Sequence, residues 1–214
     1  MALPNSLPSR TTGVQNEAIE YPDEIRAGDA VKLPGPIAYD AALTVEVRVG
    51  ELLARHSSTG RYWPRKSTEL AATEADSQTV LSVDDAHPFE IGDVVTVGDR
   101  TGTYTITAKD EDSSPNTITV SSGLTGGTNP SPVNARVYVA SNGLGNAVGI
   151  AAERFTPNTQ KPAVGQGSMY IAGLFYKGKL KGSAAGVDTQ AQSDLGGTTI
   201  TRTGDPDGDL YRIA

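Results

Sequence analysis

The sequence lacks cysteine entirely, and it contains two histidines and one tryptophan in 214 residues. Without cysteine the fold can hold no disulfide and no thiolate-bound metal, which fits synthesis in a reducing cytosol. No apolar run approaches the roughly 18 residues that suggest a membrane span, and the first residues lack the apolar stretch of a signal peptide. The sequence therefore predicts no membrane segment.

A basic surface is also missing. The net charge is −7 and the isoelectric point is about 4.8. Nucleic-acid binding requires a face that neutralises phosphates, and scattered lysines and arginines in an acidic chain provide none. We therefore expect no nucleic-acid partner, and the charge is better explained as a contribution to solubility.

The chain offers little material for catalysis. A nucleophilic triad needs a histidine base that converges with a nucleophile and an orienting acid. Here His56 stands beside two serines in a predicted hairpin, and His87 precedes a proline in a predicted turn. The sequence contains no phosphate-binding glycine loop and no metal-binding pair of histidines. We expect no enzyme, no cofactor and no metal.

The residues that are abundant favour strands. Thr, Val, Ser and Gly recur along the chain, with 24 glycines and 13 prolines. β-branched residues fit a pleated surface, and glycine and proline mark turns. The predicted fold class is mainly β, with one short helix.

Residues 1–36 have the composition of an extended N-terminal arm. Five prolines exclude a continuous helix, and the apolar residues stand singly. Such a segment is either a free terminus or an arm that becomes ordered as an added strand on a neighbour. Removal of residues 1–30 is expected to leave the rest folded. The candidate contact residues of the arm are Val14, Ile19, Tyr21, Pro22 and Ile25.

Residues 37–67 and 141–214 are predicted to form a β-rich body. Strict alternation predicts a strand over 43–49, and a hairpin over 51–64 has Gly60 in its turn. Further strands are predicted at 147–152, 168–176, 198–201 and 210–213, and a helix at 187–195 stops at Gly196. The candidate core or interface anchors are Trp63, Tyr170, Phe175 and Tyr176.

Residues 68–140 are predicted to be a separate small domain. A short helical turn is expected over 68–76. Five short strands then follow at a spacing of about ten residues, which is typical of a small sandwich or barrel. The predicted strands are 79–83, 94–97, 103–108, 117–120 and 135–139.

Segments of the predicted body resemble a known family. The run from Gly50 to Arg55, followed by Ser58 to Pro64, is similar to the strand–turn–strand of the head-decoration, or capsid-cement, proteins of lambda-like tailed phages. Residues 147–153 and 169–180 resemble the strands that those proteins carry next, and the helix and strand at 187–202 keep the same order. The resemblance covers residues 40–66 and 145–203, and 68–140 is an insertion that simple members of the family lack.

The resemblance implies a structural role in a virion. It implies a homo-oligomer, a trimer, that is made in the host cytoplasm and binds threefold positions on the outer surface of an expanded capsid. The N-terminal arm would pair with the major capsid protein. The insertion would project outward, where a host-surface glycan is a candidate ligand.

Two other classes of function remain open at this point. One is a different phage structural part, such as a head-fibre or tail subunit, although no long repeat is present. The other is a carbohydrate-binding adhesion module, for which Tyr104 and Asn116 are the candidate contact residues.

Overall fold

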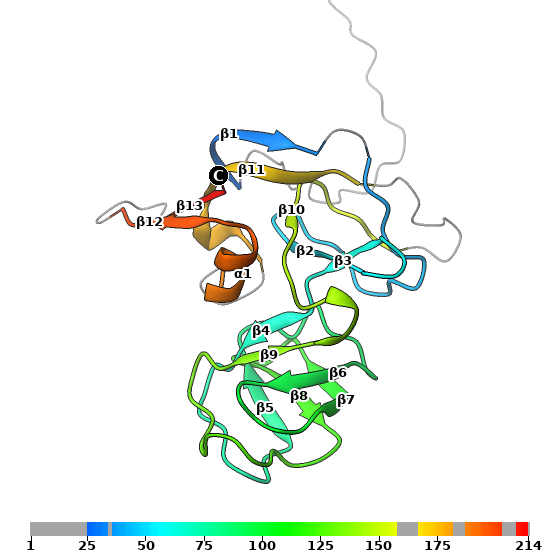
Figure 1. Cartoon of the computed structure of the whole chain (residues 1–214), viewed down its shortest axis with the longest axis vertical. Coiled ribbons are helices and arrows are strands. Elements are labelled where there is room, and N and C mark those ends of the chain that lie inside the picture. Colours follow the sequence, from blue (N-terminus) through cyan, green and yellow to red (C-terminus); the bar gives the residue numbers. More distant parts are fainter. Residues whose placement is uncertain (1–24, 34–35, 158–166, 182–186, 203–208, 214) are drawn as a thin grey trace, which may run out of the picture.

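The computed structural model describes residues 25–33, 36–157, 167–181, 187–202 and 209–213. It confirms a mainly β fold, with 41% of residues in strands that form two antiparallel sheets. Figure 1 shows the two sheets at opposite ends of the long axis of the molecule. Among the described residues, α1 (Thr189–Asp194) is the only α-helix, and no helix is both long and apolar enough to cross a membrane.

The first sheet, here called the body sheet, combines the N-terminal and C-terminal parts of the chain. Its strands lie in the order β12-β13-β11-β10-β2-β3, and β1 pairs with β11 outside this path. The strands are β1 (Arg26–Lys32), β2 (Leu52–Arg55), β3 (Tyr62–Pro64), β10 (Gly149–Ala151), β11 (Met169–Tyr176), β12 (Thr198–Ile200) and β13 (Leu210–Ile213). Two single 3-10 turns, Ser141–Gly143 and Lys177–Lys179, complete this part.

The predicted hairpin is confirmed. Strands β2 and β3 pair antiparallel, with Ala54 opposite Trp63. The connecting turn needs Gly60, whose φ of 68° lies in the left-handed region that residues with a Cβ avoid. The predicted strands at 147–152, 168–176, 198–201 and 210–213 are likewise present, and α1 stops before Gly196 at φ 62°.

One face of the body sheet is buried under α1. Phe175 lies opposite Tyr211 in the sheet, and both pack in an apolar cluster that also includes Ala191 of the helix. Asp188 caps the helix, because its carboxylate accepts a hydrogen bond from the Ala191 N–H at 2.6 Å. The helix thus fixes which face of β11, β12 and β13 points inward.

The second sheet closes into a barrel, as expected for the insertion. Its order is β4-β9-β6-β7-β8-β5. A bridge between Leu70 and Val83 then joins the first strand to the last, with Asp84 N donating to Glu69 O at 3.0 Å. Closure leaves no long free edge. The strands are β4 (Ser67–Glu69), β5 (Val80–Val83), β6 (Val94–Val97), β7 (Tyr104–Asp110), β8 (Asn116–Val120) and β9 (Arg136–Tyr138).

The chain enters and leaves the barrel at one point. Ser67 at the start of β4 lies opposite Tyr138 at the end of β9. Lys66 N donates to Leu144 O at 2.8 Å, and Val139 N donates to Lys66 O at 3.0 Å. The barrel is therefore joined to the body through two neighbouring segments of backbone.

The barrel and the body share one apolar core. Buried barrel residues such as Leu81 and Phe89 belong to the same cluster as Val47, Trp63 and Met169 of the body. The strands 67–138 form their own sheet, but their buried apolar side chains pack in one cluster with those of the body. The division into domains at residues 68 and 140 stays a prediction.

Three expectations from the sequence need correction. Residues 43–49 form no strand: Val47 makes a single bridge to Phe155, because this segment lies against both the body and the barrel. Residues 68–76 form no helical turn, since Leu70 is used to close the barrel. The predicted arm also ends sooner than residue 36, because Arg26–Lys32 is a strand of the body sheet.

The candidate arm residues divide at residue 25. Val14, Ile19, Tyr21 and Pro22 lie outside the described residues. Ile25 is 4% exposed in the body core, and its carbonyl accepts a hydrogen bond from Tyr176 N at 2.9 Å. Removing residues 1–30 would therefore damage the body, contrary to the expectation from the sequence.

Candidate functional site

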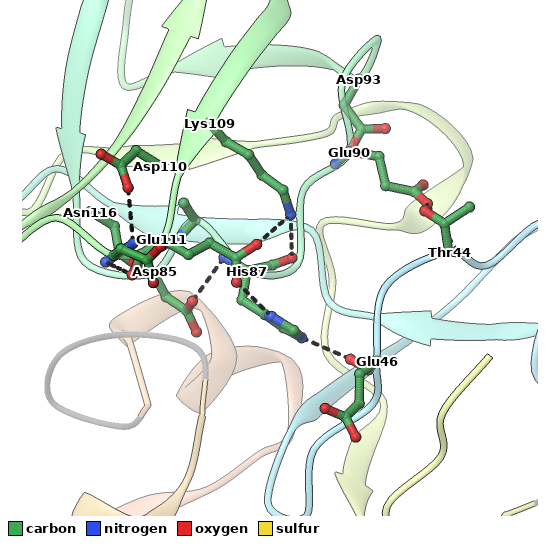
Figure 2. A network of polar contacts seen from close by, with 12 residues as sticks. Thr44, Glu46, Asp85, His87, Glu90, Asp93, Lys109, Asp110, Glu111 and Asn116 are labelled. Atoms are coloured by element: carbon green, nitrogen blue, oxygen red, sulfur yellow. Dashed lines mark hydrogen bonds and ion pairs between the residues drawn. The ribbon is translucent and has the colours of Figure 1, made fainter.

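Two surfaces combine polar groups with exposed apolar side chains. The first is the junction where residues 44–48 of the body meet residues 85–93 of the barrel (Figure 2). The second is the outer face of the body sheet, on the side away from α1.

Ion pairs and hydrogen bonds hold the barrel to the body at the junction. The guanidinium of Arg48 donates to Glu51 at 2.6 Å and to Asp85 of the barrel at 2.6 Å. His87 Nε2 lies 2.8 Å from the carbonyl oxygen of Glu46, and its Nδ1 lies 2.9 Å from Glu111. These contacts add directional restraints to the shared apolar core, which fixes the orientation of the barrel.

A buried lysine supports the same junction. Lys66 is 2% exposed, and its Nζ donates to Glu90 and to Asp93, each at 2.8 Å. The same ammonium lies 4.7 Å from the ring centre of Trp63, a favourable cation–π distance. Partial burial acts to raise the pKa of Glu90, but hydrogen bonds from Lys66 and Thr44 outweigh it and leave that pKa below its ordinary value.

A hollow of about 510 Å³ lies beside these contacts and is lined by Thr44, Val45, Glu90, Ile91 and Lys109. Ile91 is 68% exposed, so the hollow has an apolar rim next to an acid and a base. Lys109 is already engaged, because its Nζ donates to Glu111 at 2.7 Å and to the His87 carbonyl at 3.2 Å. These groups could orient a hydroxyl-rich ligand by hydrogen bonds.

A carboxyl with an unusual pKa lies between the barrel and α1. Burial raises the pKa of Glu69 to about 7, and the nearby charges of Asp188 and Asp84 add to the effect. Glu69 lies on β4, at the entrance to the barrel. The proton on this side chain therefore affects the region where barrel and body meet.

The outer face of the body sheet has a different character. Side chains alternate between the two faces of a strand, so Leu174 and Arg212, which lie opposite each other, point away from the buried pair Phe175 and Tyr211. A hollow of about 410 Å³ on this face is lined by Asp29, Gly173, Leu174, Ile200, Arg212 and Ile213. Ile200 is 40% exposed and Val31, on β1, is 56% exposed. This face is an apolar strip with one acid and one base at its sides.

The anchors named from the sequence belong mostly to the core. Trp63, Tyr170 and Phe175 are 7%, 1% and 0% exposed, and only Tyr176 is partly exposed. Within this chain the first three therefore serve packing, which leaves Tyr176 as the candidate for an interface.

The pair named for a carbohydrate site does not form one. Tyr104 is 2% exposed inside the barrel, and its hydroxyl accepts a hydrogen bond from Thr125 N at 3.0 Å. The Asn116 amide donates to the carbonyls of Glu111 and Ser113, so it holds the β7–β8 turn. His56 likewise serves a turn, because its Nδ1 accepts from the N–H groups of Ser58 and Thr59 at 3.3 Å.

Sequence reasoning missed the buried charges. Arg65 and Lys66 are each 2% exposed, although residues of these types are rarely buried unless paired. Their partners are 24 or more positions away, so no local pattern marks them. Asp188 could have been found, since an acid directly before a predicted helix is a capping signal.

Within the described ranges, no cluster of three or more histidine or acidic side chains could hold a metal ion. Comparison of the chain with protein-family models, with curated proteins and with solved structures found no match.

Proposed function

We propose that the chain is a decoration, or cement, protein of a tailed-phage head, which binds the expanded lattice at threefold positions as a homo-oligomer. It would act through the surface that it covers. A subunit that binds only the expanded lattice stabilises that lattice by mass action, and many copies act together. The bound copies would lie on the outer surface of the virion, against the major capsid protein.

One observation carries the proposal. The segments that resemble the family are far apart in the sequence, yet β2, β3, β10, β11 and β12 all lie in one sheet. Residues 67–138 close separately into the barrel, which begins and ends at one place in the body. This is the arrangement that a decoration protein with an insertion would have.

The long axis gives the two ends separate roles. Among the described residues, the body sheet has a free edge at β1 and another at β12, whereas the barrel has closed its own edges. A free edge can accept a strand from a partner. We therefore assign contacts with the lattice and between copies to the body end, with the barrel pointing away (Figure 1).

Co-sedimentation with empty heads tests the proposal. The purified chain is mixed with expanded heads that lack their decoration protein, and in parallel with unexpanded heads. We expect saturable binding to expanded heads only. Absence of binding to expanded heads, or equal binding to both forms, would contradict the proposal.

Testing whether the arm contributes to lattice binding requires a truncated chain that keeps all strands of the body sheet. A chain that starts at residue 25 keeps Ile25 and β1, so its body should unfold at the same denaturant concentration as the full chain. If the arm binds the lattice, this variant should lose most of its affinity for expanded heads. Full binding by the truncated chain would assign lattice binding to the body alone.

A second candidate function is adhesion to a host-surface glycan through the hollow beside Ile91. The observation in its favour is that the polar side chains of Thr44, Glu90 and Lys109 line a hollow next to an exposed apolar side chain. A glycan-array screen with the wild-type chain and with Ile91→Asp tests it. Binding that is lost in the variant supports adhesion, and no binding by the wild-type chain rejects it.

A further inference from the structure

We propose that the outer face of the body sheet is the contact between copies of this chain, arranged around a symmetry axis that passes close to Leu174. In this contact Asp29 of each copy lies against Arg212 of the next. The inference rests on the proposed function in one respect, namely that the chain forms a homo-oligomer. It names the surface and the residues that make the oligomer.

The three residues lie side by side across three strands. Leu174 is opposite Arg212, which places β13 on one side of it. On the other side lies β1, where a Cβ added to Gly28 would be 3.5 Å from Leu174 Cδ2, and Asp29 follows directly. Leu174, Asp29 and Arg212 line the same hollow. An aliphatic side chain is thus flanked by an acid and a base.

Neither flanking charge is used within the described part of the chain. Asp29 and Arg212 are both exposed, and neither has an ion-pair partner or a side-chain hydrogen bond among the residues that the structure describes. At the junction, by contrast, Arg48, Lys66 and Lys109 are all paired with acids. The outer face therefore keeps one charge of each sign available for a partner.

This arrangement fits a second copy of the same chain. When a patch with an acid on one side and a base on the other is rotated about an axis through its centre, the acid of each copy meets the base of its neighbour. Both charged side chains of the patch are then paired in every copy. Asp29 and Arg212 also cancel, so copies approaching through this face bring together no excess charge despite the net charge of −7.

The apolar side chains give the contact its favourable energy. Val31 on β1 and Ile200 on β12 are 56% and 40% exposed, and they flank the strip that contains Leu174. Removing such apolar surfaces from water is favourable. The aliphatic strip therefore supplies attraction, while Asp29 and Arg212 set the relative orientation of the copies.

Charge reversal tests the pairing. We would measure the mass of the free chain by sedimentation equilibrium for wild type, Asp29→Arg, Arg212→Asp and the double variant. We expect an oligomer for wild type, at least tenfold weaker association for each single variant, and recovery in the double variant. Wild-type monomers, unchanged single variants, or a double variant as weak as the single ones would each overturn the proposal.

A cysteine placed at the axis gives an independent test. The chain contains no cysteine, so Leu174→Cys introduces the only thiol. Two copies whose residue 174 lies near the axis bring these thiols within the roughly 7 Å between Cα atoms that a disulfide allows. Mild oxidation should then produce covalent dimers on a non-reducing gel. The control is Ile91→Cys, which lies on the barrel and is 68% exposed.

Equal cross-linking of the two cysteine variants, or none at position 174, would contradict the position of the axis. All of these measurements use the free chain without heads, so they are separable from the proposed function. A chain that assembles through this face but ignores expanded heads supports the interface and rejects the decoration role. A chain that binds heads but stays monomeric when free supports the decoration role and rejects the interface.

Discussion

Arg65 and Asp188 form an ion pair in which both side chains are 1% exposed. The two N–O distances are 2.6 and 3.1 Å, which makes the contact bidentate. Arg65 also donates to the Gly145 carbonyl at 2.9 Å, and Asp188 caps α1. One pair therefore connects the residue after β3, the segment after the barrel, and the helix that covers the body sheet.

Breaking this pair should strongly destabilise the chain. Asp188→Asn leaves the buried guanidinium of Arg65 uncompensated and weakens the helix cap. A buried pair broken on one side typically costs about 3–5 kcal/mol, so we expect a loss of that size in the free energy of unfolding. Urea denaturation followed by tryptophan fluorescence measures it. The double variant Arg65→Met, Asp188→Leu should be less destabilised than Asp188→Asn.

The exposed pair Lys32–Glu153 is the matched control. Its side chains are 43% and 51% exposed at a separation of 3.6 Å. Water screens such pairs, so Glu153→Gln should cost less than about 1 kcal/mol. Equal losses in Glu153→Gln and Asp188→Asn would contradict the importance assigned to burial.

Arg48 should be essential at the barrel junction. It is the hydrogen-bond partner of Glu51, which is 1% exposed, and it also binds Asp85. Arg48→Met would strand the Glu51 carboxylate in the core, and we expect a loss of about 3 kcal/mol in unfolding free energy. Arg55→Met removes an exposed arginine whose one hydrogen bond among the described residues goes to the Gly60 carbonyl, and it should cost under about 1 kcal/mol.

Glu69 should make the stability depend on pH. Its pKa is about 7 in the folded chain and 4.5 in a model compound. The unfolded chain therefore releases this proton first as pH rises, and the stabilisation present below pH 4.5 is lost between about pH 4.5 and 7.

Glu69→Gln removes this titration. The melting temperatures of the variant and wild type should be similar near pH 4, and the variant should melt several degrees higher at pH 8. Thermal melts at both pH values measure the difference. A constant difference across the range would show that Glu69 does not titrate in this way.

Gly173 should hold β1 against β11. Its φ of 142° is unfavourable for other residues, and an added Cβ would lie 2.7 Å from the Cα of Ala30. Gly173→Ala should separate the two strands locally, with a cost of about 2 kcal/mol or more and faster hydrogen exchange over residues 26–32. Gly178→Ala meets nothing within 4 Å and should change neither measurement appreciably.

Local alternation of buried and exposed side chains predicted several strands, including strands whose partners lie far away in the chain. Val95 and Val97 alternate with Val94 and Thr96, and β6 is found where this alternation indicates it. Leu43, Val47 and Val49 are buried as alternation predicts, although no ladder forms there. Alternation of apolar and polar residues indicates which side chains are buried. A β-ladder also requires a partner strand within hydrogen-bonding distance.

What depends on distant partners was not predictable. β1 has the sequence RAGDAVK, which contains few strand-forming residues, and it is a strand because β11 offers it an edge. Leu70 closes the barrel through a bridge to Val83, 13 positions later. The residues around Leu70 have a short helical pattern, so the local sequence does not indicate this bridge. The outer face needed the register of three strands before Asp29 and Arg212 could be placed beside Leu174.

The adjacent backbone segments at Lys66 and Val139 are the two points where the chain passes between the body and the barrel. Because both ends of the barrel segment leave the body side by side at these two points, a shorter turn or a different module could occupy the same position without moving β3 or β10. The replacement would have to bury the apolar side chains of Trp63 and Val47, which now pack in one cluster with barrel residues. The connection therefore allows the barrel to be replaced while the strands of the body sheet keep their positions.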